Sequence, residues 1–258
     1  KEKMQFWIIN NKPDIAEYVL QKGVNRIFLD LERIGKFERQ GHLNTWKTSH
    51  KEEDIGQLKK IVPKGKLMVR LNKLNENSKT EINNAIRGGA DWLILPMIKS
   101  IDDIEKFCSY VSLRVPVIPL IETKESIKLL PKIIKIEGIK EIYIGLNDLS
   151  LSLGSKFLFE PLANNILENA SELLNYHKIP WGFGGIARYG EGLLPAEKIL
   201  GEHVRLGSSR LILSRTFVRN LQNLSDIKES MDFSSEINKL KETINYWSSQ
   251  SNQEIKNN

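Results

Sequence analysis

The chain has 258 residues, 40% of them hydrophobic and 27% charged, which is typical of an ordinary globular protein with one large domain. Lysine and arginine number 38 against 32 aspartate and glutamate, and this net charge of +6 is too dilute to predict a nucleic-acid partner. The single cysteine, Cys108, excludes a disulfide framework, and no apolar run reaches the roughly 18–20 residues that span a bilayer, so we expect a cytoplasmic protein without a membrane partner.

Short apolar runs alternate with amphipathic stretches from one end of the chain to the other. Most of the runs are continuously apolar, as in Leu93-Ile94-Leu95, which is typical of strands covered on both faces of a parallel sheet. The eight predicted strands span residues 6–9, 26–30, 67–71, 92–96, 116–121, 141–145, 181–185 and 210–214.

The stretches between these strands carry helix signals at their ends. Gly23 and Pro63 are expected stops, and Ser78 with Glu81 has the spacing of a capping box. The predicted helices span residues 14–21, 54–61, 78–88, 101–111, 123–136, 161–177 and 195–205. This alternation predicts a closed (β/α)₈ TIM barrel, with an open doubly wound sheet as the alternative, because periodicity alone does not show closure.

Two segments depart from the repeat. Residues 32–51 form a long polar connection that holds several basic side chains and two histidines, His42 and His50. Residues 234–247 read as an additional C-terminal helix, and the polar residues 248–258 are expected to be disordered. We therefore predict a barrel over residues 1–233, followed by a helix and tail over residues 234–258.

Barrel enzymes place their active-site residues at the carboxyl ends of the strands. Glu122 and Asp148 follow neighbouring strands at equivalent positions, so their carboxylates would repel each other unless a divalent cation lay between them. The alternative is that each carboxylate caps the helix that follows it. Arg70 ends an apolar strand and must meet an anion, either a substrate carboxylate or the protein's own Asp30 or Glu32.

Four motifs in this order resemble the HpcH/HpaI aldolase and citrate lyase β-subunit family of the phosphoenolpyruvate/pyruvate barrel superfamily. They are Val69-Arg70-Leu71-Asn72, the run from Gly89 to Met97, Ile121-Glu122-Thr123, and Ile144-Gly145-Leu146-Asn147-Asp148-Leu149-Ser150, within a similarity that spans residues 26–215. The resemblance implies Mg²⁺ or Mn²⁺ held by Glu122 and Asp148, with Arg70 binding the carboxylate and enolate of a 2-oxo acid. Backbone amides from Gly145 to Asn147 would complete substrate binding.

The sequence departs from the family at the end of the second strand. The run is Asp30-Leu31-Glu32-Arg33, whereas the aldolase branch has histidine and the citrate-lyase-like branch has aspartate in place of Arg33. Proton transfer must then involve Asp30, Glu32, His50, His42 or a metal-bound water.

The basic side chains of residues 32–51, Arg33, Lys36 and Arg39 among them, suggest a substrate with extra negative charge, such as an acidic or phosphorylated sugar. A loop that packs against a neighbouring subunit is the alternative. The run from Gly182 to Ala187 has the formal pattern of a dinucleotide-binding loop but lies on the seventh strand, so we expect amides near Gly184 to hold an anionic part of the substrate instead.

The leading hypothesis is a metal-dependent class II aldolase or other carbon–carbon lyase that acts through a pyruvate-type enolate. A citrate-lyase-like enzyme for a CoA thioester and a non-catalytic barrel that binds an anionic ligand are the alternatives. We expect a small-molecule 2-oxo acid, aldehyde or thioester as partner and a homo-oligomer in which a neighbouring subunit helps to close the site.

Overall fold

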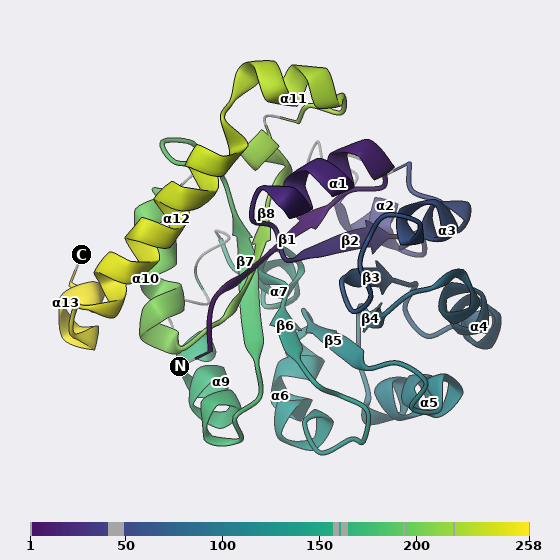
Figure 1. Ribbon diagram of the computed structural model, residues 1–258. Helices are drawn as coiled ribbons and strands as arrows, with labels where there is room; N and C mark the ends of the chain where they lie inside the picture. The colour runs from purple at the N-terminus through teal and green to yellow at the C-terminus, as the bar shows by residue number, and fades with distance from the viewer. Residues whose placement is uncertain are drawn as a thin grey trace.

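The computed structural model describes residues 2–40, 49–156, 160, 165–192, 194–218 and 220–257. Eight parallel strands form a closed barrel in which each strand pairs with the next and the last returns to the first (Figure 1). The strands are β1 Gln5–Ile9, β2 Arg26–Asp30, β3 Leu67–Arg70, β4 Trp92–Leu95, β5 Val117–Ile121, β6 Ile142–Ile144, β7 Trp181–Ile186 and β8 Arg210–Leu213. The predicted (β/α)₈ barrel is confirmed, and closure between β1 and β8 excludes the open sheet.

Most of the helices cover the outside of the barrel, whereas α2 and α7 lie at its mouth. The helices before β8 are α1 Pro13–Gln21, α2 Lys36–Gln40, α3 Glu53–Lys59, α4 Ser78–Gly88, α5 Ile101–Val111, α6 Lys124–Ile133, α7 Leu146–Ser152, α9 Ile166–Tyr176 and α10 Ala196–Leu206. The two short helices α2 and α7 were not predicted. The capping box expected for Ser78 and Glu81 is wrong, because the Glu81 carboxylate accepts hydrogen bonds from Asn72 and Asn75 side chains instead.

The strands alternate their side chains between the barrel interior and the helical shell. On β3, Met68 belongs to the interior cluster and Val69 to the shell, so Arg70 points inward again. The same alternation applies to Asp30 at the end of β2 and to Glu122 directly after β5. The barrel therefore delivers three of the predicted site residues to one mouth.

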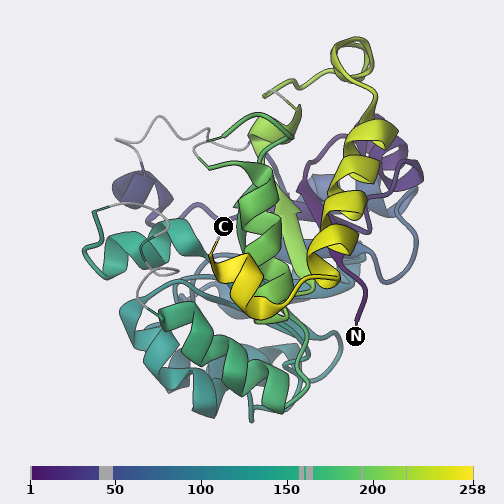
Figure 2. The same cartoon turned by 90° about the vertical axis from the view of Figure 1, so that its left-hand side faces the viewer.

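The chain beyond β8 begins with the 3₁₀ helix η1 Arg215–Val218, followed by α11 Leu224–Ser230, α12 Phe233–Ser248 and α13 Asn252–Lys256. Figure 2 shows α12 lying beside α10, where Trp247 Nε1 donates to the Glu197 carbonyl over 2.8 Å. The predicted C-terminal helix is thus confirmed. Disorder predicted for residues 248–258 is wrong over α13, because Ile255 is buried against Gly201, a contact that composition cannot reveal.

No helix in the described part of the chain combines the length and apolarity needed to cross a bilayer.

Candidate active site

Arg70 forms a bidentate ion pair with Asp30 at the barrel mouth. Its Nε donates to Asp30 Oδ1 over 2.9 Å, its Nη2 donates to Oδ2 over 2.7 Å, and Glu32 Oε2 lies 3.7 Å from Nε. Burial alone would lower the pKa of Arg70, but the Asp30 and Glu32 carboxylates raise it above its usual range. Of the two partners that the sequence left open for Arg70, the internal carboxylate is the one present, and it occupies the Nε–Nη2 edge of the guanidinium.

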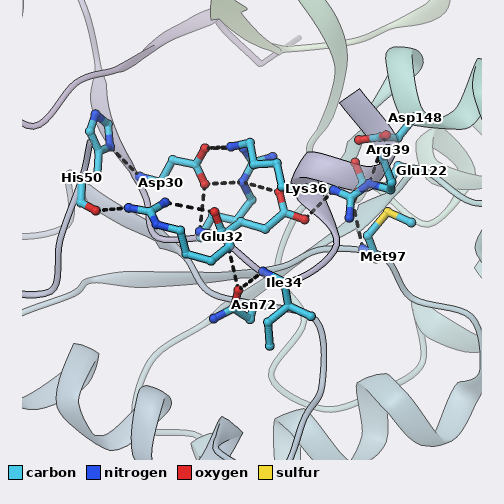
Figure 3. Close-up of polar contacts among 12 residues, drawn as sticks. Asp30, Glu32, Ile34, Lys36, Arg39, His50, Asn72, Met97, Glu122 and Asp148 are labelled. Atoms are coloured by element: carbon cyan, nitrogen blue, oxygen red, sulfur yellow. Dashed lines mark hydrogen bonds and ion pairs between the residues drawn. The ribbon is translucent and has the colours of Figure 1, made fainter. Parts of the chain in front are cut away.

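Helix α2 brings two more cations into the mouth (Figure 3). Lys36 Nζ donates to Asp30 Oδ2, and Arg39 Nη2 donates to Glu32 Oε1 over 2.6 Å. Arg39 Nε also donates to Asp148 Oδ1 over 3.3 Å. The sequence assigned these basic groups to an anionic substrate, but buried carboxylates attract cations strongly, and both side chains contact the site's own acids.

Arg33 lies at the surface and connects backbone segments. Its guanidinium donates to the carbonyls of Glu32 and His50, and its backbone N–H donates to Asn72 Oδ1 over 2.7 Å. Arg33 thereby joins the end of β2 to residue 50, and its predicted contact with substrate stays a prediction.

His50 is nearly buried and accepts a hydrogen bond at Nδ1 from the Asp30 backbone N–H over 2.9 Å. Burial is the main reason that its pKa is lowered to about 4, so the ring is neutral at pH 7 and carries its proton on Nε2. In this position His50 can donate a hydrogen bond from Nε2, whereas its Nδ1 is already engaged. The other loop histidine, His42, lies outside the described residues, as does Lys47.

Glu122 follows β5 and is almost fully buried. Its Oε1 accepts the Met97 backbone N–H over 3.0 Å, which Met97 presents from a left-handed conformation with φ 53°. The opposite oxygen faces Gly145, where a Cβ atom would lie only 2.8 Å from Glu122 Oε2. The cap of α6 is Thr123, so Glu122 does not serve the helix that follows it.

Asp148 lies in the first turn of α7, whose N-cap Gly145 has no side chain to accept a capping bond. Burial first, and then the Asp148 and Glu32 carboxylates, raise the pKa of Glu122. Arg70 and the Met97 backbone N–H lower this pKa, but burial and the neighbouring carboxylates outweigh them.

Glu122 and Asp148 fit a hard divalent cation by their donor chemistry, because carboxylate oxygens are the ligands that such cations prefer. Among the described residues no group of three or more Asp, Glu, His or Cys is arranged to hold a metal ion. The pair would therefore supply two oxygen ligands of Mg²⁺ or Mn²⁺ and leave the other positions to substrate and water.

A cavity of about 220 Å³ opens at the mouth beside this pair. Its lining brings together most of the predicted substrate and metal residues, namely Arg70, Glu122, Gly145, Asn147, Asp148 and Gly184. Gly184 has φ 61° at an irregularity of β7, and the Tyr143 hydroxyl donates to its carbonyl over 2.5 Å. Asp30, Glu32, Arg33 and His50 do not line this cavity; the first two lie behind Arg70.

Sequence reasoning missed two features of this site. It did not foresee that the Met97 backbone amide holds Glu122, since a left-handed methionine has no sequence signal. It named Lys36 and Arg39 as substrate-facing groups but did not foresee their contacts with Asp30, Glu32 and Asp148, because the polar pattern of residues 36–40 did not show that a helix would turn them inward.

A family profile described as HpcH/HpaI aldolase/citrate lyase matches residues 3–160. No curated protein sequence matches the chain. Among solved structures, an HpcH/HpaI aldolase from Desulfitobacterium hafniense DCB-2 is similar over 93% of both chains, with 14% identity and a TM-score of 0.63.

Two structures from Mycobacterium tuberculosis have the same fold. A citrate lyase β subunit complexed with oxaloacetate and magnesium shares 14% identity, with 88% of this chain and 96% of that one covered and a TM-score of 0.58. The protein CitE in complex with magnesium and pyruvate shares 13% identity, with 94% and 98% covered and a TM-score of 0.59. The family profile spans more than half of the sequence and includes Arg70, Glu122 and Asp148, and the chain belongs to the HpcH/HpaI aldolase/citrate lyase family.

Proposed function

We propose that this protein is a metal-dependent aldolase that makes or breaks a carbon–carbon bond next to a pyruvate-type enolate. The observation that carries the proposal is the placement of two carboxylates, Glu122 and Asp148, on the same cavity as Arg70. Magnesium together with pyruvate or oxaloacetate in the two mycobacterial structures supports this choice of cofactor and substrate class.

In the cleavage direction the bond between C3 and C4 of a 4-hydroxy-2-oxo acid breaks. The hydroxyl on C4 loses its proton and becomes the aldehyde carbonyl, and the bonding electron pair forms the enolate of pyruvate. A proton added at C3 then completes pyruvate. The residues of the site must bind the 2-oxo acid, stabilise the enolate oxygen and move one proton.

A divalent ion held by Glu122 and Asp148 would supply Lewis-acid stabilisation of the enolate. Arg70 adds a fixed positive charge on the same cavity, and Asp30 orients it. Burial would raise the pKa of Asp30, but Arg70 and Lys36 lower it well below its usual range, so Asp30 is suited to positioning Arg70 rather than to accepting a proton. Glu32 does not line the cavity, so it is the proposed proton carrier through a water in the cavity. His50, whose Nδ1 already accepts the Asp30 backbone N–H, is a hydrogen-bond donor and not a base.

Deuterium exchange into pyruvate tests the enolate directly. We expect the methyl signal of pyruvate in D₂O to decay when the protein and Mg²⁺ or Mn²⁺ are both present. Glu122→Gln and Asp148→Asn should slow the decay by about 10²–10³-fold, whereas Glu105→Gln on the outer surface of α5 should keep the wild-type rate.

The pyruvate assay together with a CoA-thioester cleavage assay distinguishes the aldolase from the two alternative functions. An enzyme that is silent with pyruvate but cleaves a malyl- or citramalyl-type CoA thioester would be the citrate-lyase-like lyase. Absence of both reactions with either metal would favour a barrel that binds an anion without catalysis, and would contradict the proposal.

Assembly into a homo-oligomer and a cytoplasmic location are further proposals, carried by the family resemblance and the composition. Light scattering on the purified protein would test the first, and cell fractionation the second.

A further inference from the structure

The pairing of β7 with β8 shifts by one residue beside the catalytic cavity. Gly182 of β7 pairs with Arg210 of β8. The next pair joins Gly185 to Ile212, so β7 advances three residues where β8 advances two. An extra residue of this kind is a β-bulge, which interrupts the ladder of backbone hydrogen bonds and is common beside active sites. The ladder is therefore interrupted in the wall of the cavity, which Gly184 and Gly185 line.

The Tyr143 hydroxyl bridges this interruption from β6. It donates to the Gly184 carbonyl over 2.5 Å and accepts the Ile212 backbone N–H over 3.0 Å. The ring is buried inside the barrel, with its centroid 5.3 Å from that of the Trp7 ring, and burial raises the pKa of Tyr143, so the hydroxyl keeps its proton. Because that proton is engaged by the Gly184 carbonyl, Tyr143 is suited to positioning the backbone rather than to proton transfer.

Gly184 connects the Tyr143 hydroxyl to helix α7. Its backbone is left-handed, with φ 61°, and a Cβ atom there would lie 3.1 Å from Leu146 Cδ1. The Leu146 side chain therefore lies directly against the backbone of the bulge. Leu146 is buried and begins α7, and Asp148 follows in the same turn. The conformation of the bulge thus affects the turn that carries Asp148.

The start of α7 has a second support at the end of β5. The Gly145 backbone N–H donates to the Ile121 carbonyl over 3.1 Å, and Glu122 follows Ile121 directly. One support therefore ties α7 to the strand that precedes Glu122, and the other seats it on Gly184. Together they set how the two proposed metal ligands lie relative to each other.

We propose that Tyr143 is a positioning residue for the metal site, acting through the bulge at Gly184 on the turn that carries Asp148. The proposal rests on the proposed function, in which Asp148 is a ligand of the divalent ion. Removal of the hydroxyl leaves two backbone groups of the bulge without their partner. The bulge then relaxes, and Asp148 shifts relative to the second ligand.

Binding of Mn²⁺ alone, followed by electron paramagnetic resonance, tests this role. Tyr143→Phe removes the hydroxyl but keeps the ring, and we expect its Kd for Mn²⁺ to rise about tenfold, as for other groups that orient metal ligands. Ser208→Ala is the matched control, because it removes a buried hydroxyl that lies 2.6 Å from His203 Nδ1 at the amino-terminal end of the barrel. Urea unfolding should show a loss of stability in both variants, whereas Ser208→Ala should keep the wild-type Kd.

A second variant tests the route through α7. Leu146→Ala should also raise the Kd for Mn²⁺. The double variant should raise it by less than the product of the two single effects, because the two residues act in series. Independent effects would overturn this route. If Tyr143→Phe does not fold, a raised Kd in Leu146→Ala supports the proposal and a wild-type Kd overturns it.

The same titrations distinguish a failure of this role from a failure of the proposed function. If wild type binds Mn²⁺ and Asp148→Asn does not, but Tyr143→Phe binds like wild type, the positioning role is wrong and the proposed metal site stands. If wild type binds no Mn²⁺, the proposed metal dependence and the role of Tyr143 are both overturned.

Discussion

Two buried glutamates on neighbouring strands, Glu122 and Glu141, have opposite electrostatic surroundings. Glu141 precedes β6 at the amino-terminal end of the barrel, where Arg26 contacts both of its oxygens over 2.7 and 2.9 Å and Arg210 contacts Oε1 over 2.8 Å. Burial would raise the pKa of Glu141, but the two arginines lower it. Glu122, at the carboxyl end, has other carboxylates nearby and a raised pKa.

The difference distinguishes an ion-pair network at the amino-terminal end from a carboxylate pair for which we propose a metal ion. At the amino-terminal end each oxygen of Glu141 has an arginine partner, and Arg26 also stacks 4.1 Å from the Trp92 ring. At the carboxyl end Glu122 has no arginine partner at its described oxygens, and its pKa is raised first by burial and then by the Asp148 and Glu32 carboxylates. Buried carboxylates with raised pKa values are common at catalytic and metal sites.

Removing Glu141 should have the largest effect on stability. Glu141→Gln leaves Arg26 and Arg210 buried without their main partner, and breaking such a pair costs about 3–5 kcal/mol of unfolding free energy. Urea unfolding would measure the loss, with Glu137→Gln at an exposed position as the control. A loss no larger than in the control would show that this network does not stabilise the barrel.

Removing the charge of Glu122 should have the opposite outcome. Glu122→Gln relieves repulsion with Asp148 and Glu32, so we expect unchanged or slightly higher stability together with a loss of activity of about 10²–10³-fold. Urea unfolding and the pyruvate exchange assay measure the two effects on one sample. A variant that is as destabilised as Glu141→Gln would contradict the distinction between the two ends.

Lowering the pH should reduce the stability of the fold through a buried histidine, His203, that belongs to neither ion-pair network. His203 stacks on Phe183 with ring centroids 3.9 Å apart, and burial lowers its pKa to about 3 from an ordinary 6.5. The folded chain therefore favours the neutral ring: this stabilisation is fully present above pH 6.5 and is lost as pH falls toward 3.

Between pH 7 and pH 5 the free energy of unfolding should fall by about 2 kcal/mol through His203. His50, whose pKa is also lowered, should add a loss of the same sign. Urea unfolding at several pH values should show that the free energy of unfolding falls less steeply with decreasing pH in His203→Phe than in wild type. The exposed His177 provides the control, since His177→Phe should keep the wild-type slope.

The smallest expected effect concerns Arg39, the cation that α2 places against Asp148. Because a guanidinium and a metal ion compete for the same carboxylate, Arg39→Gln should bind Mn²⁺ about tenfold more tightly, as followed by electron paramagnetic resonance. Arg87→Gln, at an exposed position on α4, should bind like wild type. Equal or weaker binding by Arg39→Gln would mean that Arg39 does not compete with the ion.

The strands, and the candidate residues at their carboxyl ends, could be predicted from local patterns in the sequence. Continuous apolar runs such as Leu93-Ile94-Leu95 mark buried parallel strands, and the residue directly after each run lies at the barrel mouth. Arg70 and Glu122 could be placed at the mouth in this way, because strand period and chain order are local properties, whereas Asp148 lies in the helix that follows β6.

The tertiary structure decided which charges meet. Whether Arg70 contacts Asp30 and whether Arg39 turns toward Asp148 depend on segments far apart in the chain. The cost of leaving a charge buried without a partner is set by this three-dimensional environment, and no local pattern records it. The sequence therefore supplied the chemical groups, and the closed barrel decided which of them neutralise one another and which face an open cavity.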